Sequence, residues 1–281
     1  MKWPYLLLPV FLMNFVFQLQ VEEHELPQFV YDDYADVLAA YVDDHGMVDY
    51  RGLKDNREKL DAFATSLGQL DPAAYDAWDD AHKIAFLINA YNALTLKLII
   101  DHYPIKASFF KSFIYPKNSI RQISGAWDKI TFLVVRQEMT LDHIEHEILR
   151  TEFKEPRIHM AIVCASKGCA KLANEPYTGD RLEEQLVQYT RLFVNNPEKI
   201  RIDKQNNTVY LSKYFQWFGE DFVPVYGTDE QFISFNEIER AALNFISRYV
   251  SEEDQQYLAE TGYSIKYLGY DWSLNEQEEK E

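Results

Sequence analysis

Cysteine is scarce in this chain: there are two in 281 residues, Cys164 and Cys169, both within the segment HMAIVCASKGCA at 159–170. Two cysteines cannot supply the four thiolates of a closed zinc site, and the sequence contains no HExxH motif that could bind zinc instead. A zinc site would have to recruit isolated histidines, so we expect no metal. All seven histidines precede both cysteines, which excludes the papain chain order, in which the cysteine comes first.

Glycine-rich phosphate loops are also absent, since neither GxGxxG nor GxxxxGK[ST] occurs. Ser166 has no G-x-S-x-G context, which argues against a serine hydrolase of the nucleophile-elbow type. We therefore expect no cofactor.

Positive charge is in short supply. Lys and Arg number 28 against 45 Asp and Glu, giving a formal net charge of -17. Such a chain repels phosphate backbones, so a nucleic-acid partner is not expected. The hydrophobic content of 47% and aromatic content of 15% are those of a globular protein.

Long apolar runs occur in two places. Residues 1–20 begin with a lysine and continue as an apolar stretch, which predicts a signal peptide or, because no small-residue cleavage site precedes Val21, an uncleaved N-terminal anchor. We therefore expect an exported protein, periplasmic or secreted, that touches a membrane only through this segment. Residues 81–104 have the length of a membrane span, but polar residues such as Asn89, Asn92 and Lys97 favour a buried core helix.

Apolar periodicity predicts helices and strands in an irregular order. Helices are expected at 28–44, 56–70, 81–104, 140–150, 178–197 and 234–250, and strands at 129–135, at 157–165, from 207 and from 263. This order favours an α+β fold: one domain over 21–275, with a buried central helix packed on a small, mostly antiparallel sheet and surrounded by helices. The acidic tail 276–281 is expected to be solvated.

Several polar residues fall where burial is expected. Glu145 lies in the apolar stripe of helix 140–150 and His146 at its edge, so Glu145 needs a partner, either within a site or in an ion pair with Arg157. On a regular strand, His159 and Cys164 would face opposite sides, which favours a core role for His159.

The two cysteines leave two interpretations open. Cys164 ends an apolar strand, and Cys169 follows Gly168 at an expected helix start, where backbone N–H groups would lower a thiol pKa. Alternatively, the two cysteines form a disulfide that closes a short loop.

The segments AFLINAYNALTL (85–96), LDHIEHEILR (141–150), EPRIHMAIVCASKGCAKL (155–172), LSKYFQWFGEDF (211–222) and YLGYDWSLN (267–275) resemble the domain of unknown function 547 family. The resemblance extends over about 28–275, and similar bacterial proteins are often exported. Ala170 stands where that family commonly has proline. The resemblance implies a role for the motif residues Asn89, Asn92, Glu145, His146, Arg157, His159, Cys164 and Cys169.

These observations lead to three hypotheses. The first is an exported thiol-dependent hydrolase or transferase acting on an amide, thioester or small-thiol substrate, small-molecule or peptide. In it Cys164 or Cys169 is the nucleophile, His146 the base and Glu145 its orienting group, with Asn89, Asn92, Arg157 and His159 as further site residues. The second is a non-enzymatic exported ligand-binding domain with a structural Cys164–Cys169 disulfide. The third, a redox partner, is the weakest because the chain lacks Cys-x-x-Cys.

Overall fold

A computed structural model describes residues 29–228, 231–260 and 262–278. The expected signal peptide or anchor at 1–20 and the end of the acidic tail at 279–281 lie outside these residues.

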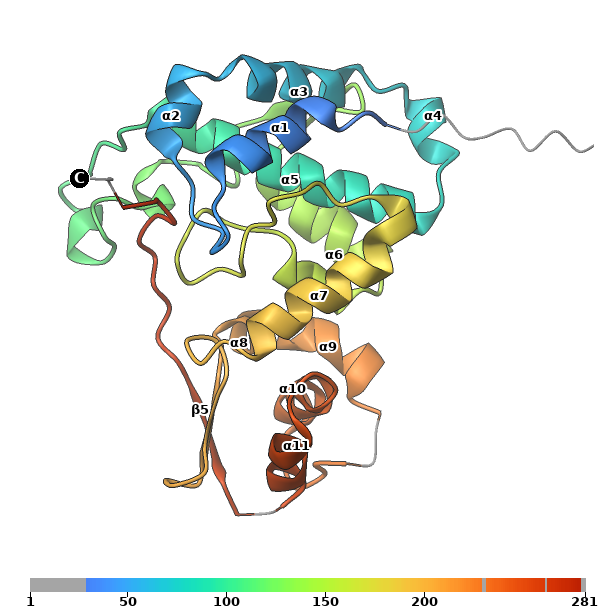
Figure 1. Cartoon of the computed structure of the whole chain (residues 1–281), viewed down its shortest axis with the longest axis vertical. Coiled ribbons are helices and arrows are strands. Elements are labelled where there is room, and N and C mark those ends of the chain that lie inside the picture. Colours follow the sequence, from blue (N-terminus) through green and yellow to red (C-terminus); the bar gives the residue numbers. More distant parts are fainter. Residues whose placement is uncertain (1–28, 229–230, 261, 279–281) are drawn as a thin grey trace, which may run out of the picture.

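The long helix α5 (Asp80–His102) lies at the centre of the larger part of the molecule (Figure 1). The Asp79 side chain caps it by accepting a hydrogen bond from the His82 N–H at 2.9 Å. Its side chains are buried around nearly the whole circumference, as the distribution of its apolar residues predicts. Although α5 has the length and composition of a membrane span, 89% of its most apolar window is buried within the fold.

Helices surround α5. Its main contacts are with α2 (Tyr50–Asp55), α3 (Glu58–Gln69), the π-helix η3 (His143–Leu149), the 3-10 turn η5 (Gly179–Arg181) and α7 (Leu182–Val194). At the edges of this first core cluster, α1 (Asp32–Tyr41), α4 (Pro72–Asp76) and the 3-10 turn η2 (Ile120–Gln122) add further residues. The short helix α6 (Arg150–Glu152) and the 3-10 turn η1 (Lys111–Phe113) contribute no buried residue to it.

A second core cluster holds the C-terminal elements. It contains α8 (Tyr214–Trp217), α9 (Gly219–Tyr226), α10 (Glu237–Ser247) and α11 (Glu252–Ala259), together with a three-stranded sheet. The end of α7 joins the two clusters, because Tyr189 packs in the first and Phe193 in the second.

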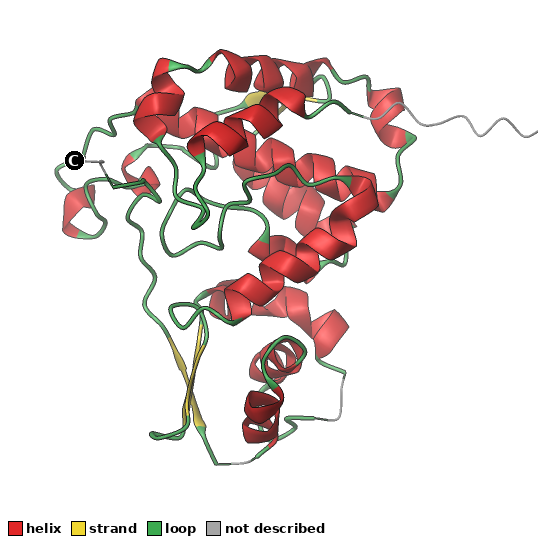
Figure 2. Ribbon diagram, in the orientation of Figure 1, coloured by secondary structure: helices red, strands yellow, loops and turns green. Residues whose placement is uncertain are grey.

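The strands are short and form two small sheets (Figure 2). β1 (Phe132–Val134) and β2 (Gln137–Met139) are antiparallel, with Leu133 opposite Glu138. In the other sheet β4 (Thr208–Leu211) is antiparallel to β3 (Arg201–Asp203) and parallel to β5 (Ser264–Tyr267). The predicted α+β class is confirmed: helices dominate, and the strand pairs are mostly antiparallel. The central helix α5, however, makes its main contacts with other helices, because the three-stranded sheet belongs to the second cluster.

The strand expected at 157–165 is not formed. The chain instead makes a 3-10 helix, η4 (Pro156–Met160), and then runs irregularly through the core. Pro156 suits the first turn of a helix, and the Glu155 side chain accepts a hydrogen bond from the Arg157 N–H. The run is apolar because it is buried on all sides, a property that strands and buried irregular segments share.

Candidate functional site

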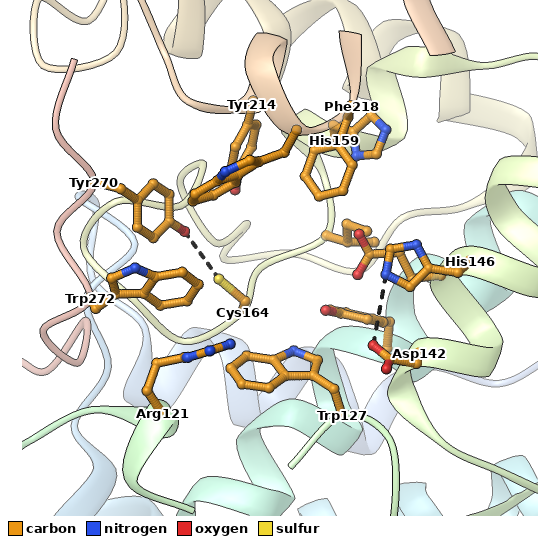
Figure 3. Close-up of a pocket in the computed structure, with 14 residues that line it drawn as sticks. Arg121, Trp127, Asp142, His146, His159, Cys164, Tyr214, Phe218, Tyr270 and Trp272 are labelled. Atoms are coloured by element: carbon orange, nitrogen blue, oxygen red, sulfur yellow. Dashed lines mark hydrogen bonds and ion pairs between the residues drawn. The ribbon is translucent and has the colours of Figure 1, made fainter. Parts of the chain in front are cut away.

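A pocket of about 290 Å³ opens where the two core clusters meet (Figure 3). One wall comes from the first cluster and includes Tyr91, Ile162 and Cys164, and the opposite wall comes from α8 and the C-terminal segment. The full set of lining residues is Tyr91, Arg121, Trp127, Asp142, Glu145, His146, His159, Ile162, Cys164, Tyr214, Trp217, Phe218, Tyr270 and Trp272.

The two cysteines occupy different environments beside this pocket. Cys164 is half-buried and lines the pocket, whereas Cys169 is 3% exposed and lies behind it. In the structure the two sulfurs form a disulfide. The Tyr270 hydroxyl lies 3.1 Å from each sulfur, and the Cys164 N–H donates to Cys169 Sγ at 3.0 Å. Only the Cys164 sulfur is therefore presented to the pocket, while Cys169 Sγ accepts the additional hydrogen bond from the Cys164 N–H.

The loop that carries the cysteines is held from two directions. Asn92 on α5 accepts a hydrogen bond from the Val163 N–H at 2.8 Å and donates to the Ala161 carbonyl at 2.9 Å. On the other side, the N–H groups of Lys167 and Gly168 donate to the carbonyls of Ser273 and Asp271. These contacts replace the strand pairing that the sequence predicted and fix the position of Cys164.

The π-helix η3 brings Asp142, Glu145 and His146 to the pocket. A π-helical turn is wider than an α-helical one and often occurs at functional sites. The Arg150 guanidinium donates to His146 Nδ1 at 2.7 Å, so the ring proton of neutral His146 belongs on Nε2, which lies 3.7 Å from Asp142 Oδ1. No hydrogen bond joins Glu145 to His146 in the described part of the chain, and Glu145 faces Tyr91, whose pKa is raised by burial and by this carboxylate.

His159 forms a second histidine site, on η4. Its Nε2 lies 2.7 Å from Asp221 Oδ2, and its ring stacks on Phe218 with centroids 4.3 Å apart. Asp221 also accepts two hydrogen bonds from Arg150, at 2.6 and 2.9 Å. One carboxylate thus contacts both His159 and Arg150, and Arg150 in turn reaches His146.

The charge of Asp221 is set by two opposing effects. Burial alone would raise its pKa, but the hydrogen bonds from His159 and Arg150 lower the pKa to about 2. Since Asp221 is ionised at neutral pH, it accepts the His159 Nε2–H and leaves Nδ1 of the neutral ring as the unprotonated nitrogen. At the start of η3, by contrast, burial raises the pKa of Asp142, the residue that precedes this helix.

Arg121 supplies the positive charge on the other side of the pocket. Its guanidinium lies 4.7 Å from the Tyr115 ring, 5.4 Å from Trp127 and 5.1 Å from Trp272, measured to the ring centroids. Figure 3 shows it extending into the pocket on the side where Cys164 lies. No ion pair joins Arg121 to a carboxylate in the described part of the chain, so its charge is available to the pocket.

Four of the expected site residues do not line the pocket: Cys169, which lies behind it, and Asn89, Asn92 and Arg157. Asn89 and Asn92 are buried and bond backbone groups, Asn89 holding both the N–H and the carbonyl of Tyr177. Arg157 pairs with Glu155 and Glu183 on the surface side of η4, so the proposed Arg157–Glu145 ion pair is not formed either. Asn89, Asn92 and Arg157 are each bonded within the fold, and a role for them in substrate binding stays a prediction.

Residues 75–194 match the model of a family described as "Protein of unknown function, DUF547". This region belongs to the DUF547 family. No curated protein and no solved structure matches the chain. The matched region is shorter than the 28–275 expected from the motifs, but it contains Cys164, His146 and His159.

The DUF547 region does not complete the pocket by itself. Asp221 and the aromatic residues of the far wall, such as Tyr214, Tyr270 and Trp272, come from the chain after residue 194. Sequence reasoning missed Asp221, Arg150 and Tyr270 as site residues, although all three lie in the quoted motifs LSKYFQWFGEDF, LDHIEHEILR and YLGYDWSLN. The adjacent acidic residues Glu220 and Asp221 within an otherwise aromatic segment are the signal that could have drawn attention to this position.

Proposed function

We propose that the pocket is the active site of a thiol-dependent hydrolase or transferase, with reduced Cys164 as the nucleophile and an amide, thioester or small-thiol compound as the substrate. The observation that carries this proposal is the asymmetry of the cysteine pair: Cys164 lines a pocket that also contains two histidines, whereas Cys169 is buried behind it. A nucleophile must reach its substrate, and of the two sulfurs Cys164 is the one that can.

In this proposal the disulfide is the oxidised resting form. A small thiol attacks Cys164 Sγ and forms a mixed disulfide, while Cys169 leaves as a thiolate held by the Cys164 N–H and the Tyr270 hydroxyl. A second thiol then attacks the sulfur of the first, which releases a low-molecular-weight disulfide and leaves Cys164 reduced.

His159 is the better candidate for the base. Asp221 fixes its Nε2–H, as the orienting carboxylate does in catalytic triads, and Nδ1 is left to accept a proton. His146 accepts a hydrogen bond from Arg150 at Nδ1 and so acts as a donor through Nε2, toward a substrate carbonyl or leaving group. Arg121 favours the thiolate over the thiol through its positive charge. In this proposal His159 takes the role of base that the sequence suggested for His146, and Asp221 takes the orienting role suggested for Glu145.

The pocket suits a small substrate or the end of a peptide. Its volume of about 290 Å³ is at the lower end of ligand-binding cavities. Six of its fourteen lining residues are tryptophan or tyrosine, whose side chains provide apolar contact with a polar edge.

The test is alkylation of the reduced protein with chloroacetamide between pH 5 and 9, with the modified residue identified by peptide mass. We expect Cys164 to react with an apparent pKa below the value of about 8.5 for a free thiol, and Cys169 to react slowly because it is buried. Cys169→Ser keeps Cys164 as a free thiol and should retain the fast reaction, whereas Cys164→Ser should abolish it. If neither cysteine is modified below pH 7 in the folded, reduced protein, the proposal is wrong.

A second candidate function is ligand binding without catalysis, with the disulfide as a structural link. It is favoured by the aromatic walls and by the pairing of both cysteines in the structure. Assays of the oxidised and the reduced protein, each verified by intact mass, separate the candidates: a protein that binds its ligand only when oxidised fits the binding domain. Retention of activity after reduction fits the enzyme.

We propose export for either function, on the basis of the apolar segment at 1–20. Fractionation of producing cells, with N-terminal sequencing of the protein, tests this. Recovery of the protein mainly in the cytoplasm would contradict it.

A further inference from the structure

A cluster of large apolar side chains is exposed outside the pocket, on the segment that precedes the turn carrying Arg121. Phe109, Phe110, Phe113 and Ile114 are 73%, 79%, 75% and 76% exposed, and they lie in the loop that joins α5 to η2. The ring of Phe109 makes edge contacts with Phe110 and Phe113 at 5.4 and 5.3 Å. We call these four residues the Phe109 patch. In Figure 1 its loop forms the green turn at the left edge of the molecule, beside the C-terminal end.

Such a patch is unusual on a soluble surface. Apolar residues exposed singly are common, but adjacent ones mark contact with a partner or a membrane. Packing in the core does not explain these side chains, because none of the four belongs to either core cluster.

The chain segment that carries the patch is positively charged, opposite in sign to the whole protein, although the Glu276 carboxylate contacts Tyr103 and Asn118 within it. Residues 102–127 contain no aspartate or glutamate, in a chain whose net charge is -17. The cations of this stretch are Lys106, Lys111, Lys117 and Arg121. Lys106 and Lys117 are exposed, and no ion pair holds either of them among the described residues.

We propose that the Phe109 patch attaches the protein to a bilayer that contains anionic lipids. Phenylalanine and isoleucine side chains enter the boundary between headgroups and acyl chains, while lysines next to them bind the negative headgroups. A second copy of this chain fits the patch less well, because self-pairing would bring lysines against lysines. This attachment is independent of the chemistry in the pocket and of the segment at 1–20.

The test is co-sedimentation of the full chain with vesicles of phosphatidylcholine alone or with about 30% phosphatidylglycerol. We expect binding to the anionic vesicles, weakened by at least about tenfold in Phe109→Ser/Phe113→Ser and in Lys106→Glu/Lys117→Glu. Ile233→Ser is the matched control, since Ile233 is also 73% exposed but lies outside the patch. All these side chains are exposed, so the variants should keep the thermal midpoint of the wild type.

A second measurement separates the patch from any contribution of the N-terminus. Tryptophan at position 109, introduced as Phe109→Trp, should be quenched by lipids with brominated acyl chains, and Ile233→Trp should not. Equal binding of the wild type and the Phe109→Ser/Phe113→Ser variant, or no quenching at position 109, would overturn the proposal. Equal binding to neutral and anionic vesicles, or a dimer in lipid-free solution that the serine variant abolishes, would also overturn it.

Discussion

Asp221 shows how one side chain can organise a site. Its carboxylate accepts hydrogen bonds from Arg150 and contacts His159, and Arg150 extends the connection to His146. Arg150, which is a cation, and His159, which can become one, therefore both depend on the single negative charge of Asp221. Removing that charge leaves buried donors without an acceptor, which costs more than the loss of an exposed ion pair.

We expect Asp221→Asn to lower both stability and activity. The pKa of Asp221 falls from 3.8 to about 2 on folding, so the ionised carboxylate contributes stability that is fully present above pH 5. This contribution, roughly 2 kcal/mol, is lost as the pH falls through 3.8 toward 2. Urea unfolding of both proteins from pH 2 to 7 should show a stability difference that grows with pH and levels off. A difference independent of pH would contradict this assignment.

Gly168 allows Tyr270 to lie against the cysteine loop. A Cβ at Gly168 would come within 2.8 Å of the Tyr270 ring, whereas a Cβ at Gly269 would meet nothing within 4 Å. We expect Gly168→Ala to displace the Tyr270 hydroxyl from the sulfurs and to cost about 1–3 kcal/mol. Gly269→Ala should leave stability nearly unchanged. Thermal unfolding and the rate of chloroacetamide labelling measure the two effects, and similar results for both variants would count against a packing role for Gly168.

At the scale of elements, α5 acts as a scaffold for two loops. Its asparagines are three residues apart, and each pairs with both the N–H and the carbonyl groups of a loop backbone. Asn92 holds the segment before Cys164, and Asn89 holds Tyr177. A polar residue inside an apolar helix is stable here because both ends of its amide are bonded.

The two asparagines form a natural comparison. We expect Asn92→Ala and Asn89→Ala each to cost roughly 2–4 kcal/mol, because each leaves a buried N–H and a buried carbonyl without a partner. Only Asn92→Ala should alter the labelling rate of reduced Cys164. Chemical unfolding gives the first quantity and alkylation kinetics the second. An equal change of reactivity in both variants would show that the effect is a general loss of structure.

Across the whole molecule, the C-terminal segment returns to the first cluster. After β5 the chain passes the cysteine loop, where Leu274 pairs with Ser166, and reaches the N-terminal part at Val48. Glu276, expected to be solvated, instead contacts Tyr103 and Asn118. The segment therefore closes the pocket and ties together parts of the chain that are distant in sequence.

Asn275 is the centre of this closure. It is 4% exposed, accepts a hydrogen bond from the Tyr50 hydroxyl at 2.7 Å and donates to the Gly46 carbonyl at 3.2 Å. We expect Asn275→Ala to cost roughly 2 kcal/mol, since the buried Tyr50 hydroxyl loses its acceptor. Asn118→Ala removes an exposed bond and should change stability by less than about 0.5 kcal/mol. Equal losses, measured by urea unfolding, would contradict the central role of Asn275.

The sequence by itself determined the properties that depend on local composition. The all-round apolar pattern of 81–104 predicts a buried helix, and the order of elements predicts the α+β class, because burial selects apolar residues wherever a segment lies. The same reasoning pointed to Cys164, Glu145, His146 and His159, all of which line the pocket. It also placed Asn89 and Asn92 in a buried core helix, where they lie.

Only the tertiary structure decided which of these residues meet. A continuous apolar run cannot reveal whether its backbone is bonded by a strand or, as at 161–163, by the side chain of Asn92. Nor can spacing show that Asp221, 62 residues from His159, is its partner. Side-chain partners are fixed by long-range packing of whole elements, and that packing depends on the entire chain at once.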